Sequence, residues 1–460
     1  MTTLWSGRFD APPDPAAFEF GKSFRFDRRM FEEDVTGSIA WARALAKAGI
    51  LPAAEADLIE KALKDIRERG RSDSTFIAGD DEDVHSFVER QLVARVGDAG
   101  RRLHTGRSRN EQVSVDLRLY LMRRIPLLQS GVAAVIASLA KQADSAGDAL
   151  MPAFTHFRAA QPVLVAHFFL AHVAGLRRDY DRLGIARSEA DALTLGSGAI
   201  AGTSYDVDVE ALAADLGFSR VVANSIDASS DRDFAATFHY ACTMTMIHLS
   251  RLAEDLIILC GEGHRFFELS DALSTGSSMM PQKKNPDPLE LVRGKTGRSV
   301  GHLMALLTAM KGLPSGYNKD LQEDKEAVFD AEDTIAGCLT AVRAIVDGLT
   351  LNRDQAAAAA TGMLLATDVA DYLVRRGLPF RRAHEVTGAL VRKLVAEGRE
   401  FDSLSPAEWR AASDLFGDDI GAHVTAQASV AAKRTPQSTS PAAVGAALSE
   451  VRSWLSRVTG

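Results

Sequence analysis

The 460-residue sequence has little cysteine, few aromatic residues and no long apolar run, and each scarcity excludes a class of protein. Its three cysteines, Cys242, Cys260 and Cys338, show no paired short spacing. We therefore expect buried thiols in a reducing compartment rather than a disulfide framework or a cysteine metal cluster. Aromatic residues make up 7% of the chain while Ala and Leu dominate, which favours helix over sheet. No apolar run reaches the length that spans a membrane.

A surplus of positive charge is also missing. The formal net charge is -8, and a nucleic-acid-binding protein needs a basic face to neutralise phosphates, so we expect no nucleic acid as a partner. An anionic substrate would instead need local cations. The first thirty residues carry acids and aromatics rather than a basic start and an apolar core. We therefore expect no secretion signal and a cytoplasmic location.

What the sequence does contain is long amphipathic periodicity. Apolar residues recur at helical spacing in five long segments, which start at Glu111, Val163, Phe234, Leu289 and Leu321. The third segment continues to about Leu269, and a helix of that size is roughly 50 Å long. A small globule cannot cover such helices along their length. We therefore expect an all-α fold in which an oligomeric bundle buries their apolar stripes.

The regions before and after these long periodic segments have a different sequence pattern. Residues 1–30 lack sustained periodicity and predict an extended arm. Helices are predicted over 31–49, 52–70 and 87–96, and from about Leu351 the chain is Ala-rich and then breaks into shorter helices. We expect an N-terminal helical domain with an extended arm (1–105), a central long-helix bundle (106–350) and a small C-terminal helical domain (351–460).

The chain is organised around Gly276–Glu290, which reads GSSMMPQKKNPDPLE. Small and hydroxyl-bearing residues are followed by two adjacent lysines and two prolines, and then by one of the long periodic segments. Gly276 gives the backbone freedom, and Pro286 or Pro288 can begin the helix because an early helical position needs no backbone donor. The stretch predicts a mobile hydroxyl-bearing lid attached to a rigid helix. The alternative is a solvated turn with two lysines.

Three other polar stretches are candidates for a site. HTGRSRN (His104–Asn110) gathers two arginines, two hydroxyls and an amide at a helix entrance, which predicts a carboxylate or phosphate trap or else a solvated basic turn. AFTHFRAAQP (Ala153–Pro162) is a non-periodic link that holds His156, although a lone histidine is more often structural. Gly312–Lys325 is a polar connector. The glycines of residues 196–202 lack the dinucleotide-binding spacing and there is no HExxH pair, so neither a nucleotide site nor a metal hydrolase is expected.

These stretches and the early arm, taken together and in their order along the chain, resemble the argininosuccinate lyase family of the aspartase/fumarase superfamily, and the PQKKNPD sequence is similar to that branch. The resemblance implies an all-α, three-domain aspartase/fumarase-like homotetramer with active sites shared between subunits. It implies cleavage of argininosuccinate to L-arginine and fumarate, the last step of arginine biosynthesis. The implied reaction is a β-elimination through an aci-carboxylate carbanion, with no cofactor and no metal.

Carried over by position, the resemblance also implies catalytic roles. Ser277 would be the general base, with Lys283 near the developing negative charge. His156 would protonate the departing guanidino nitrogen or assist through water, and Glu290 would orient its imidazole. Which of Ser277 and His156 is the acid and which the base stays open. A serine hydroxyl can act as a base only if loop closure removes water and nearby donors or cations favour the alkoxide.

The same matching implies a set of substrate-binding residues whose types suit several carboxylates and one guanidinium group. They are Ser23, Asp83, His85, Arg109, Asn110, Thr155, Arg232, Asn285, Tyr317, Gln322 and Lys325. The chain departs from the family at Arg158, where a glutamine commonly stands two residues after the histidine. Arg158 could tighten carboxylate binding or point outward, and this affects the fine geometry around His156.

Two kinds of alternative remain open. Adenylosuccinate lyase, fumarase, aspartase and the carboxymuconate cycloisomerases have related loops, but the paired lysines after Gln282 discriminate against them. A non-catalytic, crystallin-like structural protein is the second alternative, and the presence of Ser277, His156, Lys283 and Glu290 argues against inactivity.

Overall fold

The computed structural model describes residues 14–459, and these residues are mostly helical. They form two compact units. The first unit holds the described residues up to Gln129, together with Asp181–Thr243 and Arg298–Thr334. The second unit holds Ser130–Tyr180, Met244–Gly297 and the described residues from Ile335 onward. The three-domain division predicted from the sequence stays a prediction.

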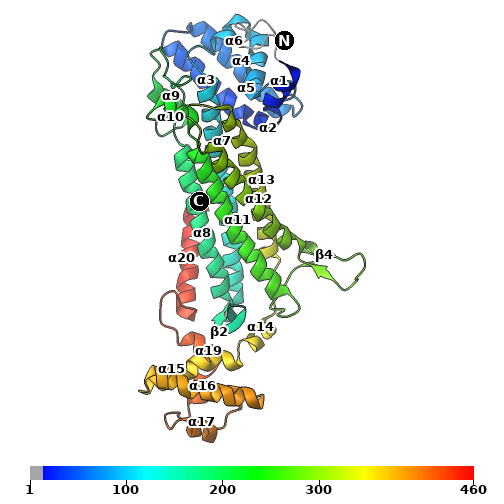
Figure 1. The fold of residues 1–460 in the computed structure, drawn as a ribbon, viewed down its shortest axis with the longest axis vertical. Helices are drawn as coiled ribbons and strands as arrows, with labels where there is room; N and C mark the ends of the chain where they lie inside the picture. Colours follow the sequence, from blue (N-terminus) through cyan, green and yellow to red (C-terminus); the bar gives the residue numbers. More distant parts are fainter. Residues whose placement is uncertain (1–13, 460) are drawn as a thin grey trace. The chain divides into compact units, whose positions relative to one another are not determined.

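Five helices in the described part of the chain have 24 residues or more, and each contributes to both units. They are α7 (Arg109–Ala146), α8 (Val165–Ala190), α11 (Asp233–Cys260), α12 (Asp287–Met310) and α13 (Asp324–Asp347) (Figure 1). The longest, α7, has 38 residues and is therefore about 57 Å long. The five long helices predicted from apolar periodicity are confirmed.

The first unit also holds the N-terminal helices, two short helices that precede α11 and one short helix that precedes α13. Their bounds are α1 Pro15–Gly21, α2 Phe24–Asp27, η2 Arg28–Met30, α3 Phe31–Lys47, α4 Ala53–Ser72, α5 Val84–Val96, α6 Asp98–Arg102, α9 Val209–Leu216, α10 Ser225–Ser230 and η4 Lys319–Glu323. Helices α3, α4, α5 and α6 gather around one core (Figure 1). The stacked rings of Phe24 and Phe87, with centroids 5.2 Å apart, hold α2 against α5. This contact positions Ser23 and Asp83, which come directly before those two helices.

The second unit contains three small antiparallel pairs of strands and the C-terminal helices. The strands are β1 Leu150–Thr155 with β2 Arg158–Leu164, β3 Phe267–Glu268 with β6 Thr350–Leu351, and β4 Thr275–Gly276 with β5 Lys284–Asn285. The helices are η3 Asp271–Leu273, α14 Arg353–Ala359, η5 Gly362–Leu365, α15 Ala366–Arg375, α16 Phe380–Glu397, η6 Phe401–Ser403, α17 Pro406–Ala412, α18 Ile420–His423, α19 Ala426–Ala431 and α20 Pro441–Thr459. Within this unit the β4–β5 hairpin projects away from α12 (Figure 1).

Three local predictions need correction. The arm was expected to be extended, but its described part is helical, because Asp14 caps α1 and Pro15 occupies a first-turn position; residues 1–13 lie outside the described residues. The link at Ala153–Pro162 is part of the β1–β2 hairpin. The helix expected to reach Leu269 ends at Cys260, because Gly261 and Gly263 have a low helix propensity.

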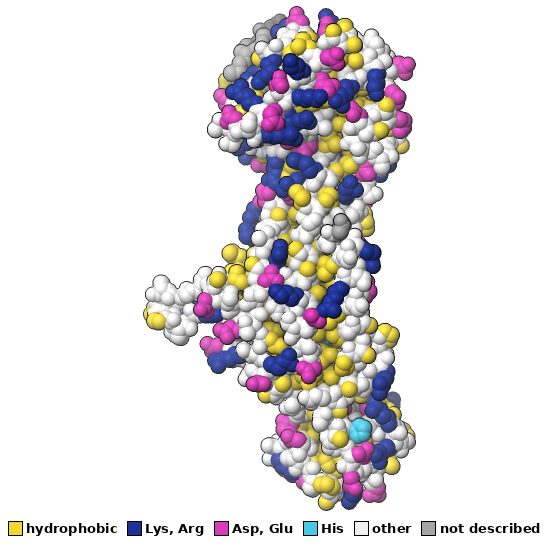
Figure 2. Space-filling model, turned by 180° about the vertical axis from the view of Figure 1, so that it is seen from behind, with side chains coloured by type: hydrophobic (Ala, Val, Ile, Leu, Met, Phe, Trp, Pro, Cys, Tyr) yellow, Lys and Arg dark blue, Asp and Glu magenta, His cyan; other side chains and the backbone are white. Residues whose placement is uncertain are grey.

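Figure 2 shows basic and acidic side chains interspersed on one face, with hydrophobic side chains exposed between them. Among the described residues no single helix is long and apolar enough to cross a membrane. The bent pair of helices Arg353–Ala359 and Gly362–Arg375 has sufficient length and apolar composition only when the two are taken together.

Candidate active site

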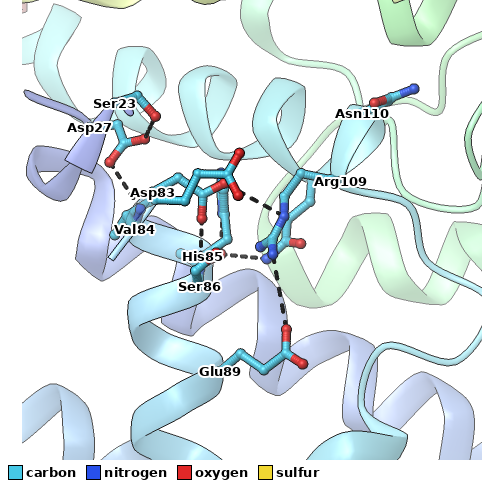
Figure 3. Close-up of polar contacts among 12 residues, drawn as sticks. Ser23, Asp27, Asp83, Val84, His85, Ser86, Glu89, Arg109 and Asn110 are labelled. Atoms are coloured by element: carbon cyan, nitrogen blue, oxygen red, sulfur yellow. Dashed lines mark hydrogen bonds and ion pairs between the residues drawn. The ribbon is translucent and has the colours of Figure 1, made fainter. Parts of the chain in front are cut away.

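Ser23 and Asp27 form a buried pair that ties α2 to the start of α5. The Ser23 hydroxyl donates to Asp27 Oδ2 at 2.5 Å, and Asp27 Oδ1 accepts the Val84 N–H at 2.9 Å (Figure 3). The Ser23 N–H donates to the Glu82 carbonyl at 2.9 Å. Burial raises the pKa of Asp27 to about 6, although its hydrogen bonds oppose that rise. Ser23 is thus fixed beside the polar start of α5.

Asp83 faces the guanidinium group of Arg109. Asp83 caps α5 by accepting the Ser86 N–H at 2.7 Å, and its other oxygen lies 3.7 Å from Arg109 Nε. Arg109 Nη2 lies 4.0 Å from Glu89 on the next turn of α5 (Figure 3). Burial alone would raise the pKa of Asp83, but Arg109 and His85 outweigh it and the pKa is lowered. Asp83 is therefore ionised at neutral pH.

Asn110 lies apart from the Arg109–Asp83 contact (Figure 3) and meets the glycine-rich loop instead. Its amide Nδ2 donates to the Ala199 carbonyl at 3.4 Å. Glu111 joins the same loop to the helix start, because its carboxylate accepts the Ser108 and Gly198 N–H groups, each at 2.9 Å. Residues 196–202 thus form a support for the first turn of α7.

His85 is buried beneath these groups. Its Nδ1 lies 2.7 Å from Asp34 and 3.3 Å from Asp116, and only 1% of each side chain is exposed. Burial would lower the pKa of His85, but the two carboxyl groups outweigh burial and raise the pKa to about 10. Burial raises the pKa of Asp116 to about 8. His85 is therefore a buried imidazolium, and its positive charge helps to keep Asp83 ionised.

The Asp34, His85 and Asp116 ligand atoms lie within 4.8 Å of one another, close enough to hold a metal ion. An imidazolium has no lone pair to offer a metal, and the Arg107 guanidinium adds a second cation beside Asp34. The pKa of Asp34 is lowered to about 2 and that of Asp116 is raised to about 8, so at neutral pH the two cations face one ionised carboxylate and one mostly protonated carboxyl group. The chemistry of this group fits an internal ion network better than a metal site.

A second buried ion group lies at the start of α13. Asp324 accepts Arg232 Nε at 2.5 Å through Oδ2 and Lys325 Nζ at 2.5 Å through Oδ1. Burial raises the pKa of Tyr317 to about 12, and Arg232 and Asp324 are among the charges that act on it. Gln322 donates to the Gly21 carbonyl at 3.2 Å, next to Ser23. Of the predicted residues, Lys325 thus belongs to this ion group and Tyr317 lies near its charges, while Gln322 lies beside Ser23.

In the second unit, a tight turn presents His156. Thr155 and Arg158 pair at the end of the β1–β2 hairpin, and His156 and Phe157 are the two turn residues between them. Both have positive φ, 54° and 57°, a conformation that few residues other than Gly and Asn adopt. Such backbone strain clusters at functional sites. The His156 side chain is exposed and makes no hydrogen bond or ion pair among the described residues.

The hydroxyl of Ser277 is held by the loop that follows it. Its Oγ accepts the Met279 and Met280 N–H groups at 3.2 and 3.1 Å. Two donors on one oxygen favour its negatively charged form. Lys284 is occupied, because its Nζ donates to the Leu269 carbonyl at 2.5 Å and lies 2.7 Å from Asp271. Lys283 is exposed, and its ammonium group has no partner among the described residues.

The remaining predicted residues, Asn285 and Glu290, belong to the β4–β5 hairpin and to the helix α12 that follows it. Asn285 Nδ2 donates to Thr275 Oγ1 at 3.5 Å across the β4–β5 pair. Glu290, in the first turn of α12, lies 3.6 Å from Arg293 and is half exposed. Among the described residues of one chain, no hydrogen bond or ion pair joins His156, Ser277 and Glu290.

Sequence reasoning missed several partners of these residues. They are Asp27, Asp34, Glu111, Asp116 and Asp324. Asp27 stands four residues after Ser23, a spacing that places both on one helical face and could have indicated the pair. Asp34 and Asp116 are far from His85 in sequence, and no local pattern connects them.

Family models match most of the chain. The lyase family matches residues 7–301, and the argininosuccinate lyase C-terminal family matches residues 363–431. Among solved structures, EDDS lyase in complex with formate is similar with a TM-score of 0.85 at 23% identity, covering 98% of this chain and 93% of that one. A class II fumarase from Schistosoma mansoni has a TM-score of 0.77 at 16% identity, covering 89% and 93%. The chain is therefore a lyase with the all-α aspartase/fumarase fold.

Curated relatives narrow the class further. The argininosuccinate lyase of Moorella thermoacetica is 47% identical over 459 residues, covering 99% of this chain and 98% of the relative. That of Desulforudis audaxviator is 45% identical over 460 residues, covering all of both chains. The chain belongs to the argininosuccinate lyase family, which confirms the resemblance predicted from the sequence motifs.

Proposed function

We propose that this chain cleaves argininosuccinate to L-arginine and fumarate, with Ser277 and His156 as the proton-transfer pair. The observation that carries the proposal is the full-length match to curated argininosuccinate lyases at 45–47% identity. The local contacts of Ser277 support its role, because two backbone N–H groups already donate to the oxygen that would become negative. Lys283 has its ammonium group free for the developing charge.

The proposed steps balance protons and electrons. Ser277 removes a proton from the succinyl carbon beside a carboxylate, and the carbon's electron pair moves into that carboxylate to give the aci-carboxylate. The pair then returns to form the carbon–carbon double bond of fumarate, while the carbon–nitrogen bond breaks and its electrons leave with the guanidino nitrogen. His156 supplies the proton that this nitrogen takes up. Each step uses side chains of the protein alone, so the proposal includes no cofactor and no metal.

The eleven substrate-binding assignments are part of the proposal. In the first unit Arg109 and Lys325 supply cations for substrate carboxylates, while Asp83 and Tyr317 lie beside them. The Arg109 guanidinium is a bidentate donor that a carboxylate fits. The His85 side chain is 1% exposed and that of Lys325 is 3% exposed, so both would act on the substrate through their charge rather than through a direct contact. In the second unit Thr155 and Asn285 accompany His156 and Ser277, and Arg158 lies across the turn from Thr155.

We further propose a cytoplasmic homotetramer whose subunits share active sites. His156, Ser277 and Glu290 lie on separate elements, and no hydrogen bond or ion pair joins them among the described residues of one copy, which supports a site that a second chain completes. In the first unit, Val300, Met304 and Leu307 are 40%, 57% and 44% exposed on one face of α12. Three apolar side chains at helical spacing suit burial against another helix.

The test follows fumarate by its ultraviolet absorbance, with argininosuccinate and adenylosuccinate offered separately. We expect fumarate from argininosuccinate and at least about a hundredfold slower release from adenylosuccinate. Faster release from adenylosuccinate would assign the chain to another branch. Release from neither would favour a non-catalytic structural protein.

A further inference from the structure

A small cavity in the first unit lies among α3, α5 and the start of α7. Its volume is about 10 Å³, and its wall includes His85 and Val88 from α5, Arg107 from the stretch before α7, and Gln112 from the first turn of that helix. Each of these four residues is at most 8% exposed. A cavity of about 10 to 15 Å³ holds one water molecule when two to four polar groups face it. The polar atoms of the wall therefore decide what the cavity binds.

Three polar atoms of this wall have no protein partner. They are His85 Nε2, Arg107 Nε and Gln112 Oε1, which are buried and make no hydrogen bond among the described residues. Another atom of each side chain is held in place. His85 Nδ1 lies 2.7 Å from Asp34, Gln112 Nε2 donates to Asp34 at 2.5 Å, and Arg107 Nη1 donates to Ser38 Oγ at 3.1 Å. Buried polar atoms of folded proteins nearly always bond to protein or to ordered water, so these three atoms indicate an occupant of the cavity.

The three atoms differ in the partner that each needs. Arg107 Nε carries a hydrogen and only donates. His85 is an imidazolium, so its Nε2 also donates. Gln112 turns its N–H toward the ionised Asp34 carboxylate, which leaves its Oε1 as an acceptor. The occupant must therefore accept two hydrogen bonds and donate at least one.

A water molecule meets these requirements, whereas simple ions do not. A halide ion would accept from the two donors but has no hydrogen for Gln112 Oε1, and a metal ion would be repelled by the cationic His85 and Arg107. Water has a second O–H as well. Either that O–H or the neutral Asp116 carboxyl can donate to Asp34 Oδ2, which lines the same cavity and is also buried without a hydrogen bond among the described residues.

We propose that this cavity binds one water molecule, which accepts from His85 Nε2 and Arg107 Nε and donates to Gln112 Oε1. The water links α5 to the start of α7 and completes the hydrogen bonds of the buried ion network around Asp34. The proposal concerns contacts inside the first unit, so it does not rest on the proposed function.

A high-resolution crystal structure of the full-length protein, with a second crystal soaked in sodium bromide, tests the proposal. We expect one density peak about 2.7 to 3.2 Å from each of the three atoms, with no bromide signal at that place. An empty cavity, a peak out of reach of any of the three atoms, or a bromide signal there would overturn it. A peak about 2.0 to 2.4 Å from its neighbours would indicate a metal ion and also overturn it.

Melting temperatures decide the question if the crystals do not diffract well enough. Val88→Ile adds one methylene group at the wall of the cavity, and the matched control Val84→Ile adds the same group at a buried position of α5 that does not line it. If water fills the cavity, the added group displaces it and leaves three polar atoms unpaired. We expect the melting temperature of Val88→Ile to lie at least about 3 °C below that of Val84→Ile. A smaller difference, or a higher melting temperature for Val88→Ile, would overturn the proposal, because a dry cavity would accommodate the added group.

Discussion

Replacement of His85 by glutamine tests whether a buried imidazolium supports the candidate site. Glutamine keeps a donor of similar size but removes the charge between Asp34 and Asp116, which lie 2.7 and 3.3 Å from Nδ1. Removing one partner of a buried ion group costs roughly 3 to 5 kcal/mol of the free energy of unfolding. We therefore expect His85→Gln to be destabilised by about that amount at pH 7.

The pH dependence gives a sharper signature than the loss itself. The pKa of His85 is raised from 6.5 to about 10 in the folded state, so its contribution is complete below pH 6.5 and is lost as the pH rises through 10. Between these values the free energy of unfolding falls by up to about 1.4 kcal/mol per pH unit, or about 2 to 3 kcal/mol from pH 7 to 9. Asp116, with its pKa raised to about 8, changes stability in the same direction.

Urea titrations followed by helical circular dichroism, at pH 7 and pH 9, measure both effects. The wild type is expected to lose stability between the two pH values, and His85→Gln to lose much less. His423→Gln, at a half-exposed histidine, is the control and should follow the wild type. Equal losses in the wild type and His85→Gln would refute the buried imidazolium.

Three further predictions concern the two units separately. Ser277→Ala should lower turnover by at least about a hundredfold while calorimetry still detects substrate binding, and a wild-type rate would rule out its role. His156→Asn should lower kcat by about a hundredfold with an unchanged melting temperature, because asparagine tolerates the positive φ of this turn; a lower melting temperature would point to a structural role instead. Glu111→Ala should lower the free energy of unfolding by about 2 to 4 kcal/mol in urea titrations, because the Ser108 and Gly198 N–H groups lose their buried acceptor, and a change below about 0.5 kcal/mol would contradict that reasoning.

The long helices could be predicted from sequence because their apolar stripes repeat over many turns, whereas the short elements could not. The β1–β2 hairpin pairs Pro152 with Pro162 and has a bulge after Ala153, so it lacks the alternation typical of strands. The helix α1 was missed although Asp14 and Pro15 form a recognisable helix start. The predicted end of α11 was too late because apolar residues continue to Phe266 and Phe267, which are buried and lead into or belong to the strand β3.

The candidate residues were predicted from motifs, but the hydrogen-bond and ion-pair partners that hold them in place were not. The local sequence identifies Ser277, His156 and Arg109 because each lies in a distinctive polar stretch. Asp34 and Asp324 act through partners that are 51 and 92 residues away in the sequence, so only folding reveals them. The contacts of Lys284 with Leu269 and Asp271 also distinguish it from Lys283, a difference that the adjacent pair KK does not contain.

The central claim is that Ser277 and His156 from different copies of the chain act on one substrate. Mixing the purified Ser277→Ala and His156→Asn variants under conditions that exchange subunits tests it directly. Sites that take both intact residues then form in mixed oligomers, and random assembly predicts recovery of up to about a quarter of the wild-type rate of fumarate release. A mixture that exchanges subunits and stays as inactive as its two components would contradict the claim.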